Sequence, residues 1–338
     1  MPRVLLTNAI HPAAHAQLAH SAEIVVATDA HADTLRRAAQ GCAVVIVRAQ
    51  LPDNIFDAAP ELIGAVRHGV GVDMIPIEAA TAHGALVANV PGVNANAVAE
   101  HVLRSMLSLA RQTQQVSAVL RQQGWAAARA AAESGVELRS RTVGIVGFGH
   151  VGQAVARLAH LGLAMRVLAH SRTPWRDDAQ AIAVTLDELM AQSDVVVLAC
   201  PLTPQTRGLI GAAQLARMRP GSWLINVARG PVVDETALLD ALRRGHLAGA
   251  ALDVFDTQPL RADHPFWQMT QVLITPHAAG VTDDSMRAMG LGAVAAVEHL
   301  LRGECPPTCV NPQALPAFAA RMQTRHGWLR VSARVSVP

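Results

Sequence analysis

Short apolar runs, rich in β-branched residues, alternate with segments of helical periodicity along the first ninety residues of the chain. The apolar runs stand at 4–6, 24–26, 44–47, 63–66 and 86–88, and the helical segments at 12–19 and 34–39. Strands that are buried on both faces read as continuous apolar runs, and parallel strands need helical crossovers between them. The pattern predicts a parallel sheet with helices on its faces.

A second alternation follows a long segment at 95–123 that has no Gly or Pro and is predicted to form one helix between two domains. Strands are expected at 142–146, 166–169, 195–198, 223–227, 250–254 and 272–274, with helices at 152–160, 186–191, 236–244 and 283–301. The last helix should return the chain to the first unit, which makes that unit discontinuous. The predicted divisions are one domain of residues 1–98 and 288–312, a second domain of 99–287, and a C-terminal tail of 313–338.

Composition narrows the functional classes. The 338 residues are 51% hydrophobic and 16% charged, which excludes intrinsic disorder. The net charge of +2 and the 3% of aromatic residues provide neither the excess positive charge nor the stacking side chains that nucleic-acid binding needs. No apolar run is long enough to span a membrane, and the N-terminal run is too short for a signal peptide. The expectation is a cytoplasmic protein without nucleic-acid or membrane partners.

Cysteine and histidine spacing predicts neither a disulfide framework nor a metal site. The four cysteines are Cys42, Cys200, Cys305 and Cys309. Cys305 and Cys309 have no second ligand pair nearby for zinc. The helically spaced His11, His15 and His20 likewise have no acidic or cysteine partners beside them.

A glycine-rich loop follows the strand predicted at 142–146 and opens a helix. It reads Gly147-Phe-Gly149-His150-Val151-Gly152. In this context the first glycine permits a tight turn, the second lets a pyrophosphate approach the backbone, and the third allows close helix–strand packing. The N–H groups at the start of the helix, from His150 and Val151 onward, then meet the phosphates. The loop predicts a dinucleotide site.

The strand after this loop ends without the carboxylate that accepts a hydrogen bond from the ribose of NAD. Ser171 occupies that position and Arg172 follows it. Serine hydrogen-bonds a 2′-phosphate and arginine pairs with it, whereas a carboxylate repels it. The sequence therefore favours NADP(H); if Arg172 points to solvent, either cofactor binds.

Three further stretches contain motifs of polar, glycine and charged residues. They are Gly69-Val-Gly-Val-Asp73 with Asn89-Val-Pro-Gly-Val-Asn94 and Glu100-His101, Asn226-Val-Ala-Arg229-Gly230 through Glu235 with Ala250 to Phe255, and Thr275-Pro-His277-Ala-Ala-Gly280. Together with the glycine loop, these stretches resemble the D-2-hydroxyacid dehydrogenase family over residues 3 to about 312. The resemblance implies an α/β fold of two doubly wound parallel-sheet domains. In it, a Rossmann-type cofactor domain is inserted into a discontinuous, flavodoxin-like substrate domain.

Two residues of these stretches suit hydride chemistry on a 2-hydroxy acid. Arginine binds a carboxylate through two parallel hydrogen bonds, and Arg229 follows an apolar strand, where α/β sheets present their ligands. Histidine exchanges protons near neutral pH. The resemblance implies that Arg229 holds the substrate carboxylate and that His277 is the acid/base.

Gln258 departs from most of the family, which carries Glu at this position beside the catalytic histidine. A carboxylate stabilises imidazolium, whereas a neutral amide orients the ring and does little more. The formate dehydrogenase branch also carries Gln, but the N-terminal part of this chain resembles the hydroxyacid enzymes. By resemblance, Asp253 approaches the nicotinamide end of the cofactor, where it would partly replace the missing charge.

The resemblance also implies the lining of the two binding sites. The N–H groups of Val70 and Gly71 would meet the substrate carboxylate, and Arg48 either contacts a distal group of the substrate or is a solvated side chain. The cofactor would also be lined by Cys200, Pro201, Thr206, Val227, Ala228 and Gly280. Cys200 has no base partner and is expected to pack rather than to act as a nucleophile.

The sequence thus predicts an NADP(H)-preferring D-2-hydroxyacid dehydrogenase that works as a 2-keto acid reductase, with NAD as a possible alternative cofactor. Glyoxylate or hydroxypyruvate is the default substrate. The alternative is a 2-hydroxy acid with a second anionic group, such as sulfolactate or 3-phosphoglycerate. The rival from another class is a non-catalytic, dinucleotide-sensing protein like the corepressors that share this fold. The resemblance implies a homodimer with the 95–123 helix at its interface.

Overall fold

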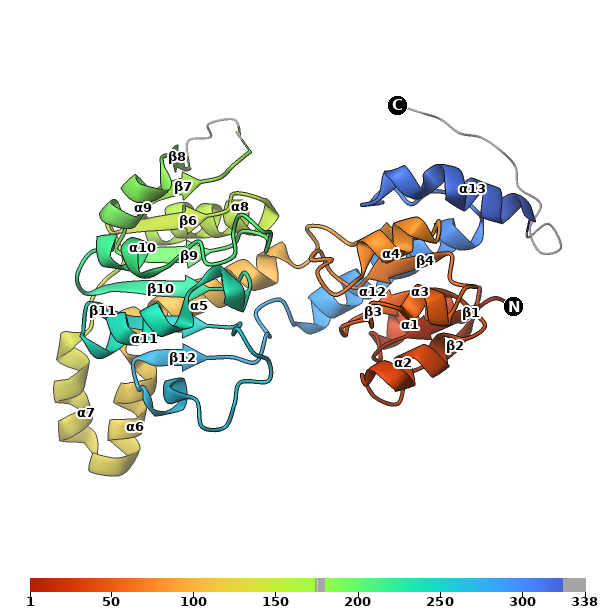
Figure 1. Ribbon diagram of the computed structural model, residues 1–338. Coiled ribbons are helices and arrows are strands. Elements are labelled where there is room, and N and C mark those ends of the chain that lie inside the picture. The colour runs from red at the N-terminus through yellow and green to blue at the C-terminus, as the bar shows by residue number, and fades with distance from the viewer. Residues whose placement is uncertain (174, 176–179, 325–338) are drawn as a thin grey trace. The chain divides into compact units, whose positions relative to one another are not determined.

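The computed structural model describes residues 1–173, 175 and 180–324, and the chain divides into two compact units (Figure 1). Unit 1 comprises Met1–Asn94 and the residues from Thr282 on, and unit 2 comprises Ala95–Val281. The predicted divisions at 98/99 and 287/288 are each displaced by a few residues. The reason is that two long helices mark the divisions: α5 (Ala95–Arg111) belongs to unit 2, where it packs on α8, and α12 (Asp283–Leu301) belongs to unit 1, where it packs on α1.

Unit 1 is a five-stranded parallel sheet in the order β2-β1-β3-β4-β5, the flavodoxin-like order. Its strands are β1 (Arg3–Leu6), β2 (Glu23–Val26), β3 (Cys42–Val47), β4 (Gly64–Arg67) and β5 (Leu86–Ala88). Its helices are α1 (Pro12–Leu18), α2 (Ala32–Ala39), α3 (Ile55–Ala58), α4 (Ile77–Ala82), α12, η5 (Pro312–Ala314) and α13 (Leu315–Thr324). Alternate strand residues face opposite layers: Val44 and Ile46 pack towards α1 and α12, whereas Val45 and Val47 pack towards α2 and α3.

The segment 313–338 was expected to be a tail, and for residues 313–324 that prediction is wrong. Ala314, Phe318 and Met322 are buried in the core of unit 1. Arg321 donates to the carbonyl oxygens of Leu62 (3.0 Å), His83 (2.7 Å) and Pro60 (2.6 Å). Ala314 ends η5, and only Phe318 and Met322 lie on the ten-residue helix α13, so the periodic signal in the sequence is short. Residues 325–338 of the predicted tail lie outside the described residues.

Unit 2 is a seven-stranded parallel sheet in the order β12-β11-β10-β9-β6-β7-β8, the doubly wound Rossmann order with β6 as its first strand. Its strands are β6 (Thr142–Val146), β7 (Arg166–His170), β8 (Ile182–Ala183), β9 (Val195–Leu198), β10 (Ser222–Asn226), β11 (Leu247–Leu252) and β12 (Val272–Ile274). Its helices are α5, α6 (Thr113–Gln123), α7 (Trp125–Ala131), η1 (Ala132–Ser134), α8 (His150–Arg157), the π-helical turn η2 (Leu158–Gly162), α9 (Leu186–Gln192), α10 (Ala212–Arg217), η3 (Gly230–Val232), α11 (Glu235–Arg243) and η4 (Pro265–Gln268). The two-residue edge strand β8 has too few residues to give a pattern in the sequence.

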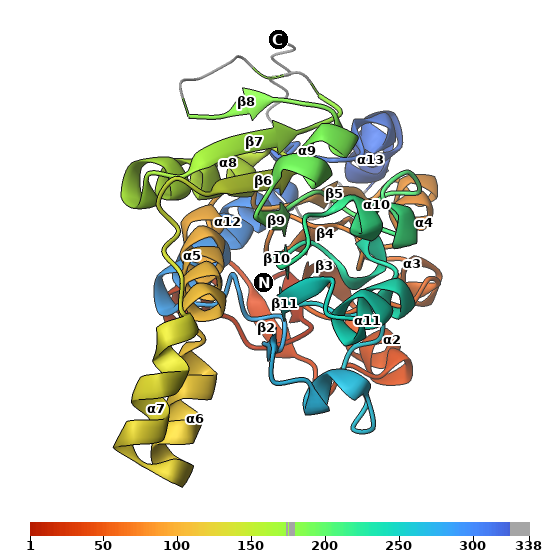
Figure 2. The same cartoon turned by 90° about the vertical axis from the view of Figure 1, so that its left-hand side faces the viewer.

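The single helix predicted at 95–123 is two helices. The chain turns at Gln112, whose φ of 48° is left-handed, and the helices α5 and α6 end and begin on either side of it. Helix α5 buries one face against the sheet, whereas α6 has no buried residue and pairs with α7 in a hairpin that projects from unit 2 (Figure 2). Gly and Pro are absent from the segment, so nothing in its composition marked the break.

The two parallel sheets expected from the alternating pattern are therefore present, and the fold class predicted from the sequence is confirmed. Within the described residues, no helix combines the length and the apolar character needed to cross a bilayer.

Candidate active site

The glycine loop after β6 is closely packed at its first and third glycines and open at its second. Gly147 has a φ of +96°, and a Cβ there would lie 2.6 Å from the backbone N of Cys200. A Cβ on Gly152 would lie 2.2 Å from the carbonyl oxygen of Gly147. A Cβ on Gly149 would meet no atom within 4 Å. The backbone at Gly149 is thus accessible to a ligand, which fits the close approach of a pyrophosphate.

Helix α8 begins directly at this loop. Gly149 is its N-cap and supplies no side chain to the first N–H groups of the helix. His150 is exposed and Val151 is half-buried at the first two helical positions. An N-terminus without a capping side chain offers N–H donors and the positive end of the helix dipole to an anion.

The position predicted to distinguish NAD from NADP lies beside this loop. Ser171 comes immediately after β7 and is half-buried, and Arg172 is exposed. The N–H of Gly147 donates to the carbonyl oxygen of His170 (2.8 Å), which ties the end of β7 to the start of the glycine loop. Ser171 is therefore held next to the predicted phosphate-binding backbone.

The residues after β9 form a compact turn. Thr206 donates its hydroxyl to the carbonyl oxygen of Pro201 (2.7 Å) and accepts from the N–H of Thr203 (2.8 Å). Cys200 is buried against Gly147, and burial raises the pKa of its thiol to about 11. A thiol that stays protonated at neutral pH is no nucleophile, in agreement with the expected packing role.

The loop that carries Arg229 is closed by one buried side chain. Asn226, at the end of β10, accepts from the N–H of Ala228 (3.0 Å) and donates to the carbonyl oxygen of Arg229 (3.1 Å). The guanidinium of Arg229 also donates to the carbonyl oxygen of Ala228 (2.8 Å), and Val227 packs on the core beneath. The main chain at Arg229 is therefore held independently of the Arg229 side chain.

Gly230 brings the loops after β10 and β11 into backbone contact. A Cβ at Gly230 would lie 1.9 Å from the carbonyl carbon of Phe255 and 2.3 Å from the backbone N of Asp256. Only glycine fits there, because the obstructing atoms are main chain. Sequence reasoning quoted Gly230 in a motif but gave it no role.

His277 and Gln258 form a direct pair. His277 Nδ1 lies 3.1 Å from Gln258 Oε1, and Gln258 Nε2 donates to the carbonyl oxygen of Phe255 (3.4 Å). An amide oxygen only accepts, so Nδ1 of His277 carries the proton and donates it. This pairing sets the ring orientation and assigns the neutral ring the Nδ1–H tautomer.

Asp253 holds the loop on which His277 lies. The buried carboxylate accepts from the hydroxyl of Thr275 (2.6 Å) and from the N–H groups of Ala278 (2.8 Å) and Ala279 (2.9 Å). The N–H of His277 donates to the carbonyl oxygen of Asp253 (2.8 Å), and His277 has a left-handed φ of 55°. The hydrogen bonds give the Asp253 carboxylate the task of holding this loop, and its approach to the nicotinamide end of the cofactor stays a prediction.

His101, on α5, extends this network. Its Nε2 lies 3.4 Å from the hydroxyl oxygen of Thr275. Burial lowers the pKa of His101, and the negative charge of Asp253 opposes that shift. Sequence reasoning gave His101 no role, and its place in the Glu100-His101 motif was the only signal that singled it out.

The predicted substrate residues Arg48, Val70 and Gly71 belong to unit 1, whereas Arg229, Gln258 and His277 belong to unit 2. Arg48 donates to the carbonyl oxygen of Ala9 and lies 4.0 Å from the sulfur of Met286 through Nη2. Burial lowers its pKa. Arg48 is therefore a half-buried cation bonded to its own unit, rather than a fully solvated side chain.

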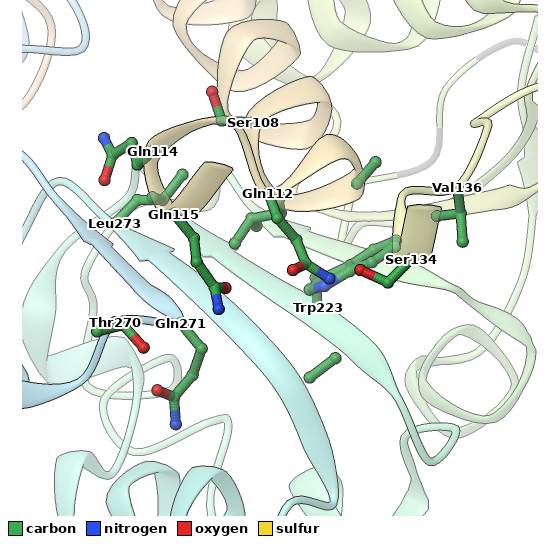
Figure 3. A pocket seen from close by; sticks show the side chains of 13 residues that line it. Ser108, Gln112, Gln114, Gln115, Ser134, Val136, Trp223, Thr270, Gln271 and Leu273 are labelled. Atoms are coloured by element: carbon green, nitrogen blue, oxygen red, sulfur yellow. The ribbon is translucent and has the colours of Figure 1, made fainter. Parts of the chain in front are cut away.

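A separate pocket of about 170 Å³ lies in unit 2 where α5 meets α6 (Figure 3). Its polar lining is uncharged and includes Gln112, Gln115 and Gln271, and Trp223 also lines it. Trp223 lies near the amino end of β10, whereas the glycine loop follows the carboxyl end of β6. The pocket is therefore at the end of the parallel sheet opposite the glycine loop. None of the predicted site residues lines it.

Among residues 1–173, 175 and 180–324, no three His, Cys, Asp or Glu side chains gather as a metal site.

The fold and the loops define an α/β protein with a Rossmann-type nucleotide-binding unit and an Arg, His and Gln at the ends of its strands. The family model "D-isomer specific 2-hydroxyacid dehydrogenase, NAD binding domain" matches residues 103–279. The chain belongs to the D-isomer specific 2-hydroxyacid dehydrogenase family, and the predicted resemblance is confirmed.

Relatives with different substrates are similar to this chain. D-3-phosphoglycerate dehydrogenase of Mycobacterium tuberculosis is 36% identical over 315 residues, which are 92% of this chain and 59% of the relative. The chain thus spans less than two thirds of that protein. Glyoxylate/hydroxypyruvate reductase B of Salmonella newport is 37% identical over 263 residues, 77% of this chain and 81% of the relative. The NADPH-dependent glyoxylate/hydroxypyruvate reductase of Sinorhizobium meliloti, solved with citrate, has a TM-score of 0.82 and 31% identity, covering 94% of this chain and 99% of that one.

Proposed function

We propose that this protein is a D-2-hydroxyacid dehydrogenase that reduces a small 2-keto acid with NADPH. The observation that carries the proposal is the His277–Gln258 pair (3.1 Å), held on a loop that the buried Asp253 fixes. A histidine whose Nδ1 is oriented by an amide can transfer a proton through its other nitrogen, Nε2. The accessible backbone at Gly149 supports the dinucleotide part of the proposal.

Each residue has a separate task in this chemistry. When bound, NADPH supplies the hydride that reduces the 2-keto carbon. The loop at Gly149 and the start of α8 hold the pyrophosphate, and Ser171 and Arg172 recognise the 2′-phosphate. Arg229 holds the substrate carboxylate, and His277 gives a proton from Nε2 to the keto oxygen. Gln258 accepts from Nδ1 in both protonation states of His277, so the ring keeps its orientation through the cycle.

The proposed substrates are glyoxylate and hydroxypyruvate. The second candidate is a keto acid with a further anionic group, and the half-buried guanidinium of Arg48 is the observation that favours it. The rival class is a protein that senses the dinucleotide without turning over a substrate.

One panel of assays separates these candidates. Glyoxylate, hydroxypyruvate, 3-phosphohydroxypyruvate and sulfopyruvate are each offered with NADPH and with NADH, and absorbance at the reduced nicotinamide band is followed. We expect the highest kcat/KM for glyoxylate or hydroxypyruvate with NADPH. A preference for the phosphorylated or sulfonated acid would select the second candidate. Tight binding of NADPH without turnover of any acid would favour the sensor.

Replacing Gln258 by Glu should move the pH profile of reduction upward. Reduction needs protonated His277, so its rate falls as pH rises through the titration of the ring. A carboxylate at 258 stabilises the imidazolium by about 1.4 kcal/mol, which shifts this descending limb by roughly one pH unit to higher pH. The measurement is kcat/KM against pH for the unaltered protein and for Gln258→Glu.

A deuterated cofactor provides the control, because a full isotope effect shows that hydride transfer limits the rate in both proteins. If the two profiles superimpose under that condition, Gln258 does not tune His277.

A further inference from the structure

The loop after β4 contains Val70 and Gly71, whose N–H groups are predicted to meet the substrate carboxylate. Its carbonyl groups accept hydrogen bonds that hold the loop in place. The N–H of Val90 donates to the carbonyl oxygen of Gly69 (2.8 Å). The side-chain Nδ2 of Asn89 donates to the carbonyl oxygen of Val70 (2.9 Å). Gly69 has a φ of +133°, which only glycine adopts without strain. Two successive peptide groups are thus anchored to the residues that follow β5.

Fixing these carbonyls also fixes the N–H groups that belong to the same peptides. A trans peptide is planar, so its N–H points opposite to its C=O. The Gly69 carbonyl faces Val90, so the N–H of Val70 points away from that residue. The Val70 carbonyl faces Asn89, so the N–H of Gly71 points away from Asn89. Neither N–H has a protein acceptor within the described part of the chain.

Arg67, the last residue of β4, holds the two carbonyls on either side. Its Nε donates to the carbonyl oxygen of Gly71 (2.9 Å), and its Nη1 donates to those of His68 (2.9 Å) and Val47 (2.8 Å). Four consecutive carbonyls, from His68 to Gly71, therefore each have a donor. The loop has little freedom to rotate a peptide and withdraw an N–H.

Asn89 is in turn held by the C-terminal part of the chain. The hydroxyl of Thr308 donates to the carbonyl oxygen of Asn89 (2.6 Å), and Ala88 forms an antiparallel bridge with Cys309. The N–H of Val310 donates to the carbonyl oxygen of Val87 (2.8 Å). Residues 308–310 thus lie along the end of β5 and restrain the main chain from which the Asn89 amide extends.

We propose that Asn89 is a positioning residue that aims the N–H groups of Val70 and Gly71 at the carboxylate of a 2-keto acid, and that Thr308 holds Asn89 in place. Asn89 acts through the Val70 carbonyl, and its own amide does not contact the substrate. The inference rests on the proposed function, because it assigns these N–H groups to a substrate carboxylate. According to this inference, the affinity for the substrate depends on Thr308, to which the sequence analysis assigned no role.

The first test is Asn89→Ala. Loss of one neutral hydrogen bond that orients the loop should raise KM for glyoxylate by about 5- to 10-fold. The N–H pair binds the carboxylate equally in the ground and transition states, so kcat should stay within about twofold. The dissociation constant of NADPH, measured by its fluorescence, should not change. The affinity for oxamate, a carboxylate probe that is not reduced, should fall by the same factor as the KM rises.

The second test uses a matched pair at Thr308. Thr308→Val keeps the shape but removes the hydroxyl, and should raise KM for glyoxylate by about 2- to 5-fold. Thr308→Ser keeps the hydroxyl and should restore the KM of the unaltered protein. Thermal unfolding of all variants is followed in parallel, because a merely structural role would lower Tm without separating KM from kcat.

The outcomes are distinct. If the unaltered protein reduces 2-keto acids but Asn89→Ala and Thr308→Val leave both KM and oxamate affinity unchanged, the positioning inference is wrong and the proposed function stands. The same holds if Thr308→Ser behaves like Thr308→Val. If the unaltered protein turns over no 2-keto acid, the proposed function and this inference both fail.

Discussion

Replacing Arg229 by alanine should nearly abolish reduction of the 2-keto acid while NADPH binds within a few-fold of its original affinity. Removing one partner of a desolvated, hydrogen-bonded ion pair costs about 2–5 kcal/mol, or roughly a 30- to 5,000-fold loss of kcat/KM. The main chain should stay in place, because Asn226 binds the Ala228 N–H and the Arg229 carbonyl without help from the guanidinium. Steady-state kinetics and NADPH fluorescence titration measure the two effects separately.

Arg229→Lys is the matched variant, since lysine keeps the charge but has no planar fork to pair with a carboxylate. Its kcat/KM should fall between those of the unaltered protein and of Arg229→Ala. If the alanine variant keeps both its KM and its kcat, Arg229 does not hold the carboxylate. If Arg229→Ala also lowers the affinity for NADPH, the substitution has disturbed the conformation of the loop that carries Arg229, and the loss of activity cannot be assigned to the guanidinium.

The unaltered protein should prefer NADPH to NADH, and Ser171→Asp with Arg172→Ala should reverse the preference. Ser171 follows β7 beside the glycine loop, where a carboxylate would accept from the ribose hydroxyl and repel a 2′-phosphate. Loss of a charge-assisted phosphate contact costs about 1.5–3 kcal/mol, or roughly 10- to 150-fold. The ratio of kcat/KM for the two cofactors, measured with one keto acid, reports the change.

Arg166→Ala provides the control. Arg166 is an exposed arginine at the other end of the same strand, so Arg166→Ala changes the net charge by the same one unit as Arg172→Ala alone and should leave the cofactor ratio unaltered. Equal kcat/KM for NADPH and NADH in the unaltered protein would refute the preference itself. If Arg166→Ala and Arg172→Ala change the cofactor ratio equally, the preference for NADPH comes from long-range electrostatics and not from a contact of Arg172 with the 2′-phosphate.

Several features of the site were predictable because short motifs or the family resemblance mark them in the sequence. The glycine loop needs three glycines at fixed spacing after a strand, and the structure places Gly147 and Gly152 in close contacts that no side chain would allow. The packing role of Cys200 was expected because the sequence offers it no base partner, and the side chain is buried. The pair of His277 and Gln258 was expected from the motif, and the two side chains do make contact.

Other features have no local signal because their partners are distant in sequence. The Asp253 carboxylate binds N–H groups 25 and 26 residues away, and main-chain donors leave no trace in residue types. Thr308 meets Asn89 across 219 residues of sequence. Helix α13 is docked by Arg321 on carbonyl groups, which every residue carries, so its place in unit 1 could not be predicted.

The sequence by itself determined two parallel α/β units, a glycine loop for a dinucleotide and the family of the protein. These features were readable because strand burial and tight backbone turns restrict which residue types can occupy consecutive positions. Tertiary structure alone decided how the loop that carries His277 is held, where the 95–123 segment breaks and how the C-terminal segment packs. Those outcomes depend on main-chain hydrogen bonds and on core contacts between segments far apart along the chain. Such bonds place few demands on residue type, so only the folded chain reveals which donors and acceptors meet.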